Sequence, residues 1–126
     1  MASRARSRTL ASPQRGEVYL VRFGPPVGAE MRKTRPALIV QNDIGNRVGP
    51  VVIVAAISSQ VPDRPSPVEV LVAAHEGGLH VRSVVLLNYV YSLDRRRLVR
   101  RLGVLRPATL AHVNRALAVS LGLVEL

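Results

Sequence analysis

The sequence predicts an α+β domain dominated by β-strands, and three observations lead to this class. Short segments rich in β-branched and aromatic residues recur about every ten residues. Glycine, proline and asparagine punctuate the chain between these segments. One segment near the C-terminus instead spaces its apolar residues at helical intervals. About six short, mostly antiparallel strands with one closing helix favour a strongly curved sheet or a partial barrel.

The first three predicted strands each have a distinct signature. Residues 17–23 (EVYLVRF) are β-branched and aromatic. Residues 35–41 (RPALIVQ) form the second strand, after a long loop at 24–34 that contains glycines and prolines. Asparagine, aspartate and glycine at 42–46 then predict a turn. Residues 51–58 (VVIVAAIS) are apolar on both faces, so we expect the third strand to be the most buried.

The second half of the chain predicts three more strands and two helical segments. The strands are expected at 68–72, 83–91 and 99–105. Ser92 is a good N-cap for a short helical turn at 94–98. The helix at 107–121 begins with a proline, which suits its first position, and Gly122 suits its end. Arg106 is a poor N-cap for this helix.

The charge of the chain points to a polyanionic partner. Eighteen Lys and Arg against eight Asp and Glu give a net charge of +10. All the cations except Lys33 are arginines, whose guanidinium grips phosphate with two hydrogen bonds. A GC-rich coding sequence is an alternative reason for the arginine excess. Residues 1–14 lack periodicity and are interpreted as a disordered basic arm, which leaves 15–126 as one domain.

Several classes of protein are excluded or disfavoured. The chain has no cysteine, which suits a reducing cytoplasm. Its longest apolar run, 51–57, is far shorter than the roughly 18 residues that span a bilayer, so we expect no membrane partner. The three histidines lack zinc-site spacing, and no glycine-rich nucleotide fingerprint is present. We therefore expect neither a metal nor a cofactor.

Arg35 and Ser58 are the pair of residues whose relative position the sequence predicts most specifically. If the strands at 35–41 and 52–58 pair antiparallel, their equal length sets Arg35 opposite Ser58 at one end of the sheet. An arginine beside a hydroxyl could hold a phosphodiester there. A sheet-edge arginine and an ordinary strand-end serine explain the spacing equally well. His75 and His80 offer another possibility, a general acid and base pair, although exposed loop positions are the simpler interpretation.

Several segments, in order and spacing, resemble the MazF/PemK/Kid family of toxin endoribonucleases from type II toxin–antitoxin modules. The resemblance extends from Arg15 to Gly122. The main matching segments are RGEVYLV (15–21), KTRPALIV (33–40), QNDIGN (41–46), VIVAAISS (52–59) and SVVLL (83–87).

The resemblance implies an SH3-like partial barrel that forms a homodimer and cleaves single-stranded RNA without a metal, by in-line attack of the 2′-OH. It implies that Arg35 and Ser58 are catalytic, with Ser58 in place of the family's threonine. It also implies an acidic antitoxin as partner. The substrate-binding residues expected by analogy are Arg32, Lys33, Thr34, Asn42, Ser59, Tyr89 and Tyr91.

One segment departs from the family pattern. Where relatives commonly have Glu-Gln-Ile-Arg-Thr, this chain has NYVYS at 88–92. Tyr89 and Tyr91 could stack on splayed bases, and we expect at most one of them to reach solvent. Two alternative functions remain: a gyrase poison of the related CcdB type, disfavoured because the chain has no tryptophan, and a non-catalytic nucleic-acid-binding barrel.

Overall fold

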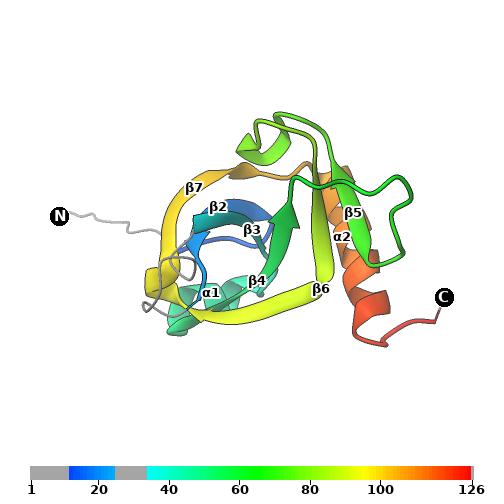
Figure 1. Cartoon of the computed structure of the whole chain (residues 1–126). Coiled ribbons are helices and arrows are strands. Elements are labelled where there is room, and N and C mark those ends of the chain that lie inside the picture. Colours follow the sequence, from blue (N-terminus) through cyan, green and yellow to red (C-terminus); the bar gives the residue numbers. More distant parts are fainter. Residues whose placement is uncertain (1–11, 25–33, 126) are drawn as a thin grey trace.

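The computed structural model describes residues 12–24 and 34–125. In this part of the chain six strands form one antiparallel sheet in the order β5-β6-β4-β3-β2-β7, with β5 and β7 at its edges (Figure 1). The strands are β2 (Glu17–Arg22), β3 (Thr34–Ile39), β4 (Val51–Ser58), β5 (Glu69–Val72), β6 (Ser83–Asp94) and β7 (Leu98–Val104). The helical elements are α1 (Asp43–Val48), the 3₁₀ turns η2 (Glu76–Gly78) and η3 (Arg95–Arg97), and α2 (Pro107–Ser120). The predicted strand-dominated α+β fold, an open barrel with a C-terminal helix, is confirmed.

Two local predictions were wrong. The stretch expected as a turn is the short helix α1, because the Asn42 side chain accepts a hydrogen bond from the Gly45 N–H at 2.8 Å and caps a helix there. Ser92 is not an N-cap, since β6 continues through it to Asp94. The Asp94 carboxylate caps the following turn by accepting the Arg96 N–H at 2.8 Å. In both cases an Asx side chain decides where a helical segment begins.

Strand β6 is long because it pairs with two neighbours and bends between them. Its register against β4 shifts between the pairs Ala55–Val90 and Ala56–Leu86, so residues 87–89 fall outside that ladder. The Leu87 N–H is donated to the Val68 carbonyl at 2.9 Å instead. An irregularity of this kind increases local twist, which lets the strand follow a curved sheet.

The curved sheet carries one apolar cluster on each face. The larger cluster includes Leu38, Leu87 and Val113, all fully buried, and α2 packs against β5 and β6 on this side (Figure 1). The smaller cluster comprises Val21, Ala37, Ile39, Val52 and Val54, also fully buried. Within the described residues, no helix is both long enough and apolar enough to cross a bilayer.

A junction between η2, β7 and α2 closes one end of the fold. A Cβ atom built on Gly103 of β7 would lie 2.5 Å from the Gly77 carbonyl carbon, so only glycine permits this approach. The adjacent Glu76 is buried, and its Oε2 accepts the Arg106 N–H at 3.0 Å. Because Arg106 provides no side-chain cap itself, Glu76 supplies a carboxylate to the positive end of α2 from outside the helix.

Candidate active site

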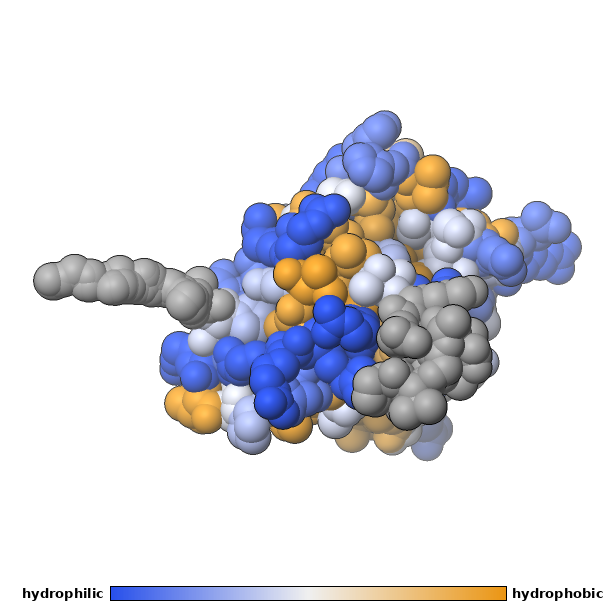
Figure 2. Space-filling view, turned by 60° about the vertical axis from the view of Figure 1, so that its left-hand side comes forward, coloured by the Kyte–Doolittle hydropathy of each residue, from blue (hydrophilic) through white to orange (hydrophobic). Residues whose placement is uncertain are grey.

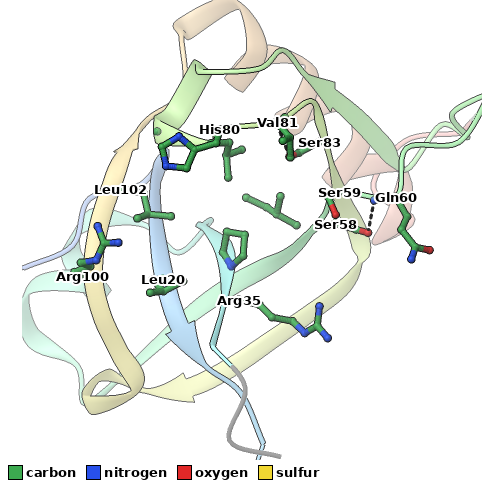
Figure 3. Close-up of a pocket in the computed structure, with 14 residues that line it drawn as sticks. Leu20, Arg35, Ser58, Ser59, Gln60, His80, Val81, Ser83, Arg100 and Leu102 are labelled. Atoms are coloured by element: carbon green, nitrogen blue, oxygen red, sulfur yellow. Dashed lines mark hydrogen bonds between the residues drawn. The ribbon is translucent and has the colours of Figure 1, made fainter. Parts of the chain in front are cut away.

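A pocket of about 850 Å³ opens between the ends of several strands (Figure 3). Its floor is apolar, and polar and charged side chains stand around it. The lining residues include Arg35, Ser58, Leu20, Leu79, His80 and Arg100. The volume falls in the range of about 300–1,000 Å³ that is typical of ligand pockets.

The register of β3 and β4 brings Arg35 and Ser58 to the same rim of this pocket. Ala37 pairs with Ala56 and Leu38 with Ala55, and the same register extended by two residues sets Arg35 opposite Ser58. Figure 3 shows both side chains at one side of the pocket. The predicted juxtaposition of the two strand ends is therefore confirmed, whereas the catalytic roles of the two residues stay predictions.

The Ser58 hydroxyl is oriented by its own loop. The Gln60 N–H is donated to Ser58 Oγ at 3.0 Å, shown dashed in Figure 3, and the side chain is half-buried. A hydroxyl has one hydrogen to donate and two lone pairs. Because one lone pair is already used, the hydroxyl hydrogen remains for an anionic oxygen in the pocket.

The Arg35 guanidinium is exposed, and no hydrogen bond or ion pair joins it to another residue among those described. The two ion pairs within the described residues are Arg101 with Glu17 at 2.6 Å and Arg96 with Asp94 at 3.0 Å. The Arg96 side-chain hydrogen bond holds the pKa of Asp94 at about 2. No residue in 12–24 or 34–125 therefore occupies the hydrogen-bond donors of Arg35, which suit a bound anion.

The far rim carries Arg100, which the sequence did not place in a site, and His80, which the sequence offered as one member of an acid and base pair. Figure 3 shows His80 and Arg100 across the apolar floor from Ser58. Arg100 was one of many arginines, so composition gave no signal for it. His75, the expected partner of His80 in an acid and base pair, does not line the pocket. It occupies the N-cap position of η2 with a positive φ of 78°. The pocket therefore contains one imidazole rather than the hypothesised two.

The other expected substrate-binding residues are distributed unevenly. Ser59 lines the pocket, whereas Thr34 is exposed at the start of β3 and does not. Asn42 caps α1, which occupies its side-chain oxygen. Arg32 and Lys33 lie outside the described residues. Contact of any of these residues with RNA stays a prediction.

The two tyrosines of the departing segment are both exposed, Tyr89 by 52% and Tyr91 by 39%. The expectation that at most one would reach solvent was wrong, because residues two apart on a strand share a face. The Tyr91 ring meets Phe23 edge-on, with 5.4 Å between the ring centroids. Neither tyrosine lines the pocket, and stacking on a base stays a prediction.

The surface near the edge strand β7 combines charge with apolar area. Figure 2 turns the β7 side of Figure 1 forward and shows strongly hydrophilic residues around a central hydrophobic area.

Among the described residues, no group of three or more His, Cys, Asp or Glu side chains is placed to hold a metal ion. The polar side chains that line the pocket carry guanidinium, hydroxyl, imidazole and amide groups.

Comparison with known proteins places the chain among toxins. Endoribonuclease EndoA of Bacillus subtilis (strain 168) is 38% identical over 112 residues, covering 89% of this chain and 97% of that protein. Endoribonuclease MazF of Staphylococcus saprophyticus is 39% identical over 110 residues, covering 87% and 92%. A solved mycobacterial endoribonuclease in complex with its cognate antitoxin matches with a TM-score of 0.73 at 28% identity, covering 91% of this chain and 100% of that one.

The family model for the PemK-like, MazF-like toxin of type II toxin–antitoxin systems matches residues 14–121. This range includes all the described strands and α2. The resemblance inferred from the sequence is confirmed, and the chain belongs to the PemK-like, MazF-like toxin family.

Proposed function

We propose that this chain is an endoribonuclease that cleaves single-stranded RNA as the toxin of a toxin–antitoxin pair, with Arg35 and Ser58 holding the scissile phosphate. The observation that carries the proposal is the β3–β4 register, which sets a guanidinium and a hydroxyl at one rim of a pocket. The endoribonucleases to which the chain is 38% and 39% identical support the activity.

The chemistry is an internal transfer at phosphorus. The 2′-oxygen of the RNA forms a bond to the adjacent phosphorus, and the bond from phosphorus to the 5′-oxygen breaks. The 2′-OH loses its proton and the leaving oxygen gains one, so the products are a 2′,3′-cyclic phosphate and a 5′-OH end. Negative charge builds on the non-bridging oxygens, where Arg35 donates two hydrogen bonds and Ser58 donates one.

The nucleophile is supplied by the substrate, so Arg35 and Ser58 act by position and charge. Guanidinium and hydroxyl groups ordinarily have pKa values far too high to serve as a base near neutral pH. Preorganised donors contribute by stabilising the transition state more than the bound substrate. Cleavage is therefore expected to persist in EDTA, because the charge stabilisation comes from these donors.

The test incubates the purified chain with a long single-stranded RNA in EDTA and maps the fragment ends. We expect fragments with 5′-OH ends, a loss of about 10²–10³-fold in rate for Arg35→Ala, and a smaller loss for Ser58→Ala. Ser58→Thr keeps the hydroxyl and should stay close to wild type. Arg115→Ala removes an equal charge from the exposed side of α2 and is the matched control.

Other outcomes of the same test separate the alternatives. Intact RNA bound tightly by the wild-type chain would indicate a non-catalytic nucleic-acid-binding barrel. In a parallel incubation with gyrase and DNA, trapped gyrase–DNA adducts from a chain that leaves RNA intact would indicate a gyrase poison. Equal activity of Arg35→Ala and Arg115→Ala would remove Arg35 from the mechanism.

The partners follow from charge and family. The net charge of +10 favours an acidic antitoxin, because the surface it must cover is positive. A cytoplasmic homodimer with residues 15–126 as a single domain completes the proposal. Most of the basic arm expected at 1–14 lies outside the described residues, which begin at Ser12. Light scattering of the purified toxin with and without its antitoxin tests the dimer and the complex.

A further inference from the structure

The far rim of the pocket carries two polar side chains that have no role in the proposed cleavage step. Arg100 and His80 line it, while the scissile phosphate is assigned to Arg35 and Ser58 on the near rim. We propose that Arg100, assisted by His80, binds the RNA phosphate next to the scissile one. This inference rests on the proposed RNA cleavage.

The sheet register places Arg100 on the same surface as the pocket floor. Arg100 of β7 pairs with Leu20 of β2, and Leu20 pairs with Pro36 of β3. The β3–β4 register, extended from Ala37 and Ala56, continues this row to Ile57. All four residues line the pocket, so the row runs from a cation at the edge strand across an apolar floor.

The span between the two rims suits a nucleotide. β7 and β3 are separated by β2 alone, which puts their backbones about 10 Å apart at the usual strand spacing. Both arginines line the pocket, and Figure 3 shows the Arg35 guanidinium on the other side of the apolar floor from Arg100. A sugar and base can lie on the floor while the phosphates on either side meet the two guanidiniums.

The adjacent residues Arg100 and Arg101 differ in whether another described residue pairs with them. Arg101 is ion-paired with Glu17 at 2.6 Å, which neutralises it on the fold itself. No hydrogen bond or ion pair links Arg100 to any residue in the described ranges 12–24 and 34–125. A guanidinium at a pocket rim with no partner among these residues is suited to bidentate binding of a phosphate. His80, exposed on the same rim, adds a hydrogen-bond donor.

The experiment uses a short RNA spanning a cleavage site mapped on the long substrate. In separate syntheses, the phosphates on the 5′ and 3′ sides of the scissile one are replaced by uncharged methylphosphonates. KM and kcat are measured for wild type, Arg100→Ala, His80→Ala and the control Arg115→Ala. The full-length protein is used throughout, and circular dichroism checks that each variant is folded.

Arg100→Ala should raise KM by about 10-fold or more with little change in kcat, because a charge-assisted hydrogen bond to substrate is lost. His80→Ala should raise KM less. One methylphosphonate should raise the wild-type KM by a similar factor and have no further effect on Arg100→Ala, since the same contact is removed twice. Arg115→Ala should respond to that methylphosphonate as wild type does.

Two results would overturn the inference while leaving the proposed function intact. One is an Arg100→Ala variant with the KM of Arg115→Ala. The other is a KM effect of Arg100→Ala that adds fully to the effect of each of the two methylphosphonates. Should Arg100→Ala fail to fold, Arg100→Gln replaces it in the same cycle. A wild-type chain that leaves the RNA intact would instead refute the proposed function and the inference with it.

Discussion

Replacing Glu76 should destabilise the fold through the first turn of α2. The Glu76 Oε2 accepts the Arg106 N–H at 3.0 Å, and the residue is only 8% exposed. The helix begins at Pro107 without a side-chain cap of its own, so Glu76 is the described group that fills this role. Loss of a helix cap costs about 0.5–2 kcal/mol. Loss of a negative charge at a helix N-terminus costs about 0.3–1 kcal/mol more.

The expected cost of Glu76→Ala is therefore about 1–3 kcal/mol in the free energy of unfolding. Glu76→Gln keeps an acceptor oxygen and loses only the charge, so its cost should be about 0.3–1 kcal/mol. The two variants thus separate the hydrogen bond from the charge. Asp63→Ala, in an exposed loop, is the surface control and should stay within about 0.5 kcal/mol.

The assay is denaturant unfolding at neutral pH, followed by the far-ultraviolet signal. The midpoint should fall for Glu76→Ala with an unchanged slope, since the surface exposed on unfolding is nearly the same. Amide hydrogen exchange at the start of α2 should also accelerate in this variant. A Glu76→Ala protein as stable as Asp63→Ala would refute the idea that this carboxylate caps the helix.

Two further outcomes are expected from other contacts. Gly103→Ala should cost about 1–3 kcal/mol in the free energy of unfolding, because the new Cβ would lie 2.5–2.8 Å from the backbone of Gly77 and Gly78; a wild-type midpoint in denaturant would contradict this. The Asp94 carboxyl should titrate at a pKa of about 2 by NMR, below its ordinary value of 3.8. Asp94→Asn should be less stable than wild type only at pH values above this pKa. Because the pKa is lowered in the folded state, the stabilisation is present above about pH 4 and disappears as the pH falls through about 2. A carboxyl that titrates at 3.8 would contradict this prediction.

The near rim of the pocket could be predicted because it depends on neighbouring strands. β3 and β4 follow each other in the chain, joined by residues 40–50 with α1 between them, and their apolar residues fix which strand faces match. Equal strand lengths then gave the pairing of Arg35 with Ser58 that the register confirms. Strand alternation also contained the answer for Tyr89 and Tyr91. Residues two apart share a face, so the expectation that at most one reaches solvent misapplied the rule.

The helix α1 could not be recognised from local pattern because side-chain hydrogen bonds rather than helix propensity hold it. It is six residues long and contains Gly45, which disfavours a helix in isolation. Its fully buried Asn46 donates to the Gln41 carbonyl at 3.0 Å and accepts from the Gln41 side chain at 3.0 Å. These two bonds hold the segment in a conformation that propensity alone would not select.

The far rim required contacts between distant parts of the chain. Arg100 reaches the pocket only because β7 pairs with β2, the first and last described strands, and His80 only because η2 packs on β7. That packing depends on Gly77 and Gly103, which have no side chains to reveal it in a pattern. The residues that seat η2 and the residues that we propose bind the second phosphate therefore belong to one junction. Substitutions at its glycines should lower both the free energy of unfolding and the affinity for RNA. Substitutions of Arg35 and Ser58, which stand apart from this junction, should slow cleavage and leave the free energy of unfolding unchanged.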